Sequence, residues 1–391
     1  MKSNYRYIVK AFMAMAVIAG TTSCDDFLDR EPMSSISPET YYSTAAQLEA
    51  NLNDEYPNVL PSFGQWTYGI FGEDKGTDNQ IEVNANDRYT QDRWKVPHSE
   101  SDNWKFERIY RINFFLSEAL PKFGEDMSGS QNTISGSVAT IKHYIGEMYF
   151  LRAYEYFKKL QLFGDFPIIN QPLADEMEAL REASKRFPRN EVARFIISDL
   201  DKAYAYMSDV DMATTRINKD AAMLVKSRVA LFEATWLQNF KGTAFVPGGE
   251  GWPGASLHNN YQYPSGNLDN EVKYFLEQAV EASKLVADKY KGNLTENTGV
   301  LQQSADDPSN PYFDMFAQED LSDVKEVLLW RQYARGLSTH NINAAAGRGN
   351  YRIGLTRGFV QNFLMKDGTP VYAHGSYADG DGYYMGSLIH I

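Results

Sequence analysis

The sequence predicts a mostly α-helical protein, with tetratricopeptide-like helix pairs wound into an α-α superhelical scaffold, long irregular aromatic-rich loops and little β-structure. Apolar residues recur at helical spacing in several segments, and Ser, Asn or Gly stands where these segments begin or end. The helices recur in units of about 34 residues, the tetratricopeptide period. Between them lie stretches rich in Gly, Asn, Pro and aromatic residues, such as 57–100 and 245–267.

The start of the chain has the features of an export signal. Basic residues precede the apolar run 11–20, which is too short to span a bilayer, and small residues lead to Cys24, the only cysteine. We predict a lipoprotein signal peptide over 1–23, a lipid on Cys24 and an acidic tether over 24–37. An incidental free thiol is the alternative interpretation of this cysteine.

Capping residues and apolar spacing predict the helices in order. Ser37 and Pro38 suit the N-cap and first residue of a helix, and Asn190 and Asn218 suit two later N-caps. Gly164 suits a helix end. The expected helices cover 38–53, 102–123, 137–163, 191–207, 219–240 and 270–290.

The helix over 137–163 is expected to be central and buried, because its part 145–163 is apolar on most faces. Arg152 lies within this apolar part, and a buried charge must be paired, so we predict a structural ion pair there. Segment 326–333 predicts a strand or a short buried segment. We expect one domain over 38–391, with a helical scaffold mainly over 38–290 and an irregular part over 291–391.

The composition disfavours several function classes. A formal net charge of −13 repels nucleic acid and anionic lipid. None of the six histidines is spaced for metal binding, and no P-loop, dinucleotide fingerprint or nucleophile elbow is present. We interpret adjacent acids such as Glu73 and Asp74 as solvated loop residues and not as catalytic carboxylates. We therefore predict no catalytic residue, no metal and no cofactor.

Aromatic residues in the long loops are the candidate ligand-binding residues. The apolar face of a sugar stacks on an indole or phenol ring, and neighbouring amides and carboxylates bind its hydroxyls. The alternative is that these rings pin the loops onto the helices. The candidates are Trp66, Tyr68, Asp78, Asn79, Trp94, Trp252, Tyr261 and Tyr263.

Several stretches, in order along the chain, resemble the SusD/RagB family of surface nutrient-binding lipoproteins of Bacteroidota. The most specific is "FLRAYEYFKKLQLFGDFP" within 147–169, which is similar to the family's FLRA and FGDxP elements. The other similar stretches are 23–32, 104–116, 189–203, 218–234, 326–333 and 365–370.

The resemblance implies a function as well as a fold. It implies a lipid-anchored protein on the outer face of the outer membrane, which binds oligosaccharides and delivers them to a SusC-like TonB-dependent transporter. It also implies a binding protein and not an enzyme. A peptide-binding RagB-like role and a helical glycoside hydrolase or lyase are the alternatives. Family members usually continue beyond the element at 365–370, so we expect the irregular part to be incomplete.

Overall fold

The computed structural model describes the protein in ranges separated by short gaps. Within them the chain is mostly helical, as predicted, with two short strands, β1 (Gln80–Ile81) and β2 (Gly354–Leu355), paired antiparallel. The tetratricopeptide-like winding and the domain limits stay predictions. The described residues are 41–64, 74–81, 103–124, 126–208, 212–300, 304, 306–334, 336, 339–340, 354–365, 367–370 and 373.

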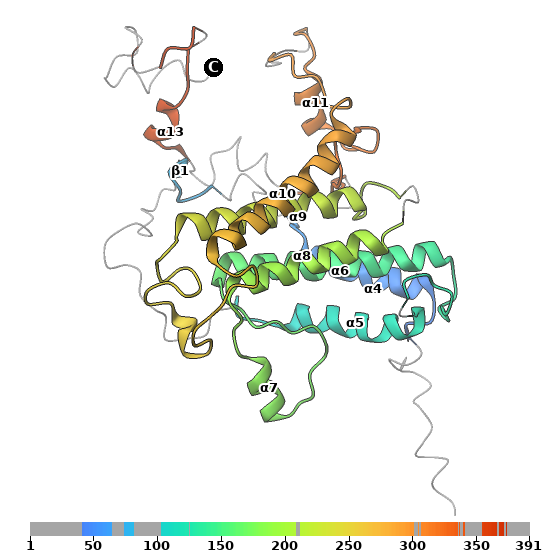
Figure 1. Ribbon diagram of the computed structural model, residues 1–391. Coiled ribbons are helices and arrows are strands. Elements are labelled where there is room, and N and C mark those ends of the chain that lie inside the picture. The colour runs from blue at the N-terminus through green and yellow to red at the C-terminus, as the bar shows by residue number, and fades with distance from the viewer. Residues whose placement is uncertain are drawn as a thin grey trace, which may run out of the picture.

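The long helices stack as successive rows around a central helix, and the short helices lie outside this stack (Figure 1). α6 contacts α4 and α5 on one side and α8 on the other, and α9 and α10 continue the stack from α8. The helices are α4 (Ala45–Val59), α5 (Glu107–Phe123), α6 (Val138–Phe163), α7 (Met177–Ala183), α8 (Arg189–Tyr206), α9 (Lys219–Asn239), the 3-10 helix η3 (Pro253–Ser256), α10 (Leu268–Tyr290), α11 (Pro311–Ala317) and α13 (Arg357–Gln361).

α6 is the centre of the core, and its predicted limits are confirmed. The Ser137 hydroxyl accepts a hydrogen bond from the backbone N–H of Thr140, which caps the helix start. Gly164 ends the helix at φ +67°, a conformation that favours glycine. Most of the helix surface between these residues is buried, so it packs against neighbours on several sides.

One predicted helix is interrupted, and one predicted cap was wrong. The predicted start at Ser37 and Pro38 lies outside the described residues, but a turn at 42–43 separates residue 41 from α4. α4 begins at Ala45, where Thr44 and Gln47 form a reciprocal capping box, and it continues past residue 53 to Val59 because Leu52 and Val59 stay on its buried face. Asn190 does not cap α8. It lies inside the helix, and its amide donates to Glu271 instead.

Other elements differ from expectation in smaller ways. α5 begins at Glu107 instead of 102, while the predicted Asn218 cap of α9 is confirmed by its bond from the Ala221 N–H. Segment 326–333 is half-buried and contains no strand. The short helices α7, α11 and α13 were not predicted, since each is too short to show helical periodicity.

Buried Arg–carboxylate pairs connect the rows. The ion-pair partner of Arg152 is Asp199 of α8. The Arg152 guanidinium donates two hydrogen bonds to the Asp199 carboxylate, at 2.6 and 2.8 Å. A third guanidinium nitrogen donates to Asn113 of α5. Both charged side chains are almost fully buried, so the prediction of a structural ion pair is confirmed.

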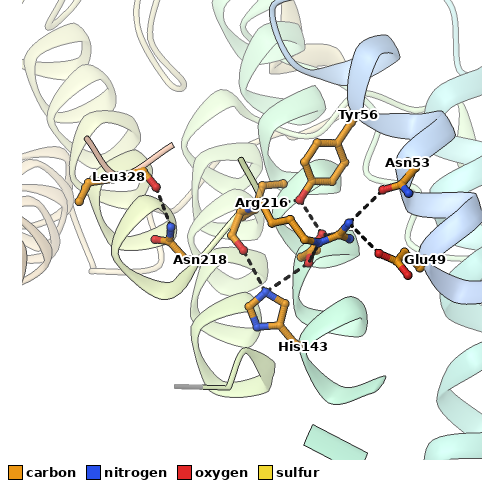
Figure 2. Close-up of polar contacts among 9 residues, drawn as sticks. Glu49, Asn53, Tyr56, His143, Arg216, Asn218 and Leu328 are labelled. Carbon is orange, nitrogen blue, oxygen red and sulfur yellow. Dashed lines mark hydrogen bonds and ion pairs between the residues drawn. The ribbon is translucent and has the colours of Figure 1, made fainter. Parts of the chain in front are cut away.

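A second buried cluster joins α4, α6 and the chain before α9 (Figure 2). Arg216 donates to the two carboxylate oxygens of Glu147 at 3.0 and 2.9 Å. The Tyr56 hydroxyl donates to Glu147 at 2.5 Å and accepts from the Ile217 N–H. His143 Nε2 donates to the Ile217 carbonyl at 3.0 Å. These bonds fix the position from which α9 starts.

The start of α9 in turn positions segment 326–333. The Asn218 amide, whose oxygen caps α9, donates to the Leu328 carbonyl at 2.6 Å (Figure 2). Trp330 donates from its backbone and its indole to Thr214, at 3.1 and 2.8 Å. The segment is therefore attached by hydrogen bonds to loops of the helical scaffold.

The Arg152–Asp199 pair yields a stability prediction. Asp199→Ala leaves a buried guanidinium without its counter-charge, so we expect the free energy of unfolding to fall by about 3–5 kcal/mol. Urea denaturation measures this loss. As a matched control, Lys273→Ala removes an exposed ion pair with Glu277 and should cost less than about 1 kcal/mol. Equal losses in the two variants would contradict the structural role of the buried pair.

Candidate ligand-binding site

A cavity of about 460 Å³ lies where the loop between α9 and α10 meets the end of α6 and the start of α8. We call it the loop cavity. Its volume falls in the range of small-ligand sites. Its lining includes Leu162, Asp165, Arg186, Arg189, Trp236, Phe245, Trp252 and Leu257.

Asp165, within the FGDFP stretch, ties the loop to the helices. One carboxylate oxygen accepts from the backbone N–H of Arg189 at 2.9 Å, and the other accepts from the Trp252 indole N–H at 2.8 Å. Burial raises the pKa of Asp165, and these two hydrogen bonds oppose the rise. The carboxylate therefore acts as a bracket between the start of α8 and the loop.

Trp252 is the one predicted residue that lines the loop cavity. Only 5% of it is exposed, and its ring stacks on His258 at 5.9 Å between ring centres. Gly254 lies so close that a Cβ there would come within 2.2 Å of the indole. The ring thus forms part of the cavity wall, and its predicted role in ligand binding stays a prediction.

Tyr261 and Tyr263 brace the same loop. The Tyr261 hydroxyl donates to the Asn190 side chain at 3.0 Å, and the Tyr263 hydroxyl donates to the Pro247 carbonyl at 2.6 Å. The two rings meet edge to face, with centres 5.2 Å apart. Both are half-buried. They do not line the loop cavity, and their binding role stays a prediction.

The remaining predicted residues lie elsewhere. The backbone carbonyls of Asp78 and Asn79 accept from Thr356, beside the β1–β2 pair, and neither residue lines the loop cavity. Cys24, Trp66, Tyr68 and Trp94 lie outside the described residues, so their predicted roles stay predictions.

The exposed apolar residues around the loop cavity were not predicted. Phe245 is 61% exposed, and Leu162 and Leu257 are more than half exposed. Such side chains around a cavity are typical of a ligand-binding groove. Trp236 stands behind them, with its indole N–H bonded to the Phe245 carbonyl at 3.0 Å. Phe245 belongs to the aromatic loop 245–267, and the composition of this loop was the sequence feature that could have indicated its role.

Two guanidinium groups border the loop cavity, and they differ in burial and in pairing. Arg189 is buried, pairs with Glu233 of α9 at 2.9 Å and lies 4.1 Å from the Trp236 ring centre. Arg186 is exposed, and its guanidinium lies 4.6 Å from the Trp104 ring centre. The cavity therefore offers ring faces, aliphatic side chains and one exposed cation.

A larger cavity of about 1220 Å³ lies under segment 326–333, between the ends of α4, α9 and α10. Its walls are mostly apolar, with Leu224, Val286 and Leu329 among the lining residues. It contains none of the residues predicted to bind ligand. The loop cavity is for this reason the better candidate site.

The described residues contain neither a metal-binding cluster nor a membrane-spanning helix. No group of three or more His, Cys, Asp and Glu side chains is placed to hold a metal ion there. No helix among the described residues combines the length and the apolar character needed to cross a membrane.

Comparison with known proteins identifies similar chains. Residues 26–231 match a SusD-like family model described as "Starch-binding associating with outer membrane". Two curated relatives from Formosa agariphila, SusD-like proteins P25 and P2, are each 25% identical, over 233 and 253 residues. These alignments cover 55% and 62% of this chain but only 41% and 46% of the relatives, so the matched part is less than half of their length.

Solved structures share the fold. A SusD-like carbohydrate-binding protein from Bacteroides fragilis matches with a TM-score of 0.53 at 15% identity, covering 86% of this chain and 57% of its own. A second SusD-like protein from the same species matches with a TM-score of 0.55 at 19% identity, covering 90% and 58%. At these identities the likeness concerns the fold alone.

The hydrogen bonds that Glu271 of α10 accepts yield a pH prediction. Burial alone would raise the pKa of Glu271, but hydrogen bonds from Arg194, Asn190 and Ser265 outweigh it and lower the pKa below 4.5. The folded state thus favours the carboxylate, and this stabilisation is present above pH 4.5 and lost as the pH falls through the lowered pKa. Glu271→Gln should be about 1–3 kcal/mol less stable than wild type at pH 7.

Urea denaturation at several pH values checks this linkage. The difference between wild type and Glu271→Gln should shrink as the pH falls below 4.5. Glu277→Gln, at an exposed position on the same helix, serves as the control and should show little difference at any pH. A wild-type advantage that is constant with pH would contradict the assignment.

Proposed function

Because the chain belongs to the SusD-like family, described as starch-binding and associating with the outer membrane, we propose that it binds a glycan at the cell surface and delivers it to a TonB-dependent transporter. The loop cavity is the observation that carries the binding part of this proposal. It combines exposed apolar side chains with hydrogen-bonding groups, the combination by which proteins hold sugars. Delivery to a SusC-like partner rests on the family resemblance.

Binding without catalysis is the favoured interpretation of this site. Hydrolysis of a glycosidic bond usually needs two carboxyl groups across the substrate. Among the described residues that line the loop cavity, Asp165 is the only acid, and both of its oxygens already accept hydrogen bonds. The site therefore supports a non-covalent mechanism, in which a sugar face lies on Phe245 and polar groups bind its hydroxyls.

We also propose that the protein is held at the outer membrane by a lipid on Cys24, facing the cell exterior. Residues 1–23 would be the leader and 24–37 the tether. The family description supports the membrane association. The small residues before the cysteine support the attachment.

Phe245→Ala tests the binding part. Removing an exposed ring should leave the fold intact and weaken binding about tenfold, which corresponds to 1.4 kcal/mol. Affinity gel electrophoresis against starch, xylan and pectin measures the change. Phe316→Ala, which removes a 73% exposed ring on α11, is the matched control. Equal retardation of both variants would refute a binding role for this cavity, and release of reducing ends from the bound glycan would refute binding without catalysis.

Cys24→Ala tests the anchor. Because the thiol is the proposed acceptor, we expect this variant to incorporate no radiolabelled palmitate in cells and to leave the membrane fraction. Ser35→Ala, in the tether, should keep the label. Persistent labelling of the Cys24 variant would rule out lipid attachment at this residue.

A further inference from the structure

Arg186 is a cation at the loop cavity that has no ion-pair partner among the described residues. The other guanidinium there, on Arg189, is neutralised by Glu233. The charge of Arg186 lowers the pKa of Asp165, but the two side chains form no salt bridge, and the Asp165 oxygens accept hydrogen bonds from the Arg189 backbone and from Trp252. The donors of Arg186 are thus available to a ligand.

The backbone around Arg186 is fixed from two sides. Its carbonyl accepts a 2.8 Å hydrogen bond from His258, which belongs to the loop between α9 and α10. The next residue, Phe187, exchanges two backbone hydrogen bonds with Phe166, at 3.0 and 3.2 Å. A cation on such a backbone loses little freedom when it binds a ligand.

The side chain is oriented as well. The guanidinium lies 4.6 Å from the centre of the Trp104 ring. Trp104 itself is held by edge contacts with Phe163 and Phe166, each with ring centres 4.9 Å apart. A guanidinium that uses its face on a ring keeps its in-plane N–H donors free, and these donors match the two oxygens of a carboxylate or sulfate.

We propose that the loop cavity selects an anionic glycan, in which the carboxylate or sulfate group of one sugar accepts hydrogen bonds from Arg186 while an apolar sugar face lies against Phe245. This inference rests on the proposed function and adds the chemical class of the ligand. The acidic chain as a whole repels such a ligand, so its recognition depends on this local cation.

Paired polymers that differ only in charge test the inference. Polygalacturonate and its methyl ester form the carboxylate pair, and dextran sulfate and dextran form the sulfate pair. We expect the wild-type protein to bind one charged polymer at least tenfold more tightly than its uncharged counterpart in affinity gel electrophoresis. The pair that shows this difference identifies the anionic group.

Variants of the arginine complete the test. Arg186→Gln should remove the preference for the charged polymer, and Arg186→Lys should keep part of it. Arg181→Gln, which removes an exposed arginine of α7 that does not line the loop cavity, should bind as the wild type does. Unchanged charge preference in Arg186→Gln, or none in the wild type, would overturn the inference. If Phe245→Ala still weakened binding to a neutral glycan, the proposed function would stand, whereas binding to no polymer would overturn both.

Discussion

The requirement that buried charges be paired organises this protein. Arg152, Arg189, Arg194 and Arg216 each contact a carboxylate on another element, and every one of those carboxylates is buried. A pair of this kind adds little net stability but tolerates no lost partner, because the remaining charge would be left in a medium of low polarity. Apolar packing alone permits helices to slide, whereas a two-pronged guanidinium contact fixes their relative position. The rows of helices are thereby held in one register.

One of these pairs also positions the wall of the loop cavity. Arg189 belongs to two contacts at once, since its side chain pairs with Glu233 while its backbone N–H binds Asp165. Asp165 then holds the indole of Trp252. A chain of three contacts thus runs from the helix stack to the wall of the candidate site. The aromatic loop is built as an extension of the core, although it is rich in glycine and carries no long helix.

Local signals predicted the fold well and the site only in part. The limits of α6 follow from Ser137 and Gly164, which act on their own neighbours in sequence. Asn190 looked like a cap because it precedes an apolar run, yet its partner Glu271 is 81 residues away and leaves no local trace. Likewise, the composition of loop 245–267 indicated rings for a ligand but not which ring is exposed. Trp252 is buried where its indole binds Asp165, which is 87 residues away in the sequence, whereas Phe245 stays exposed.

The attachment of segment 326–333 has a consequence for how the chain is assembled. Three of its hydrogen-bond partners, Ser62, Thr214 and Asn218, precede it by more than a hundred residues. The helices from α4 to α10 all precede this segment in the chain, so the stack that it attaches to is encoded before it. These three contacts span long sequence separations, so their entropic cost is lower once the helix stack is ordered. The attachment of this segment is therefore favoured by prior ordering of the helices, whichever compartment the chain folds in.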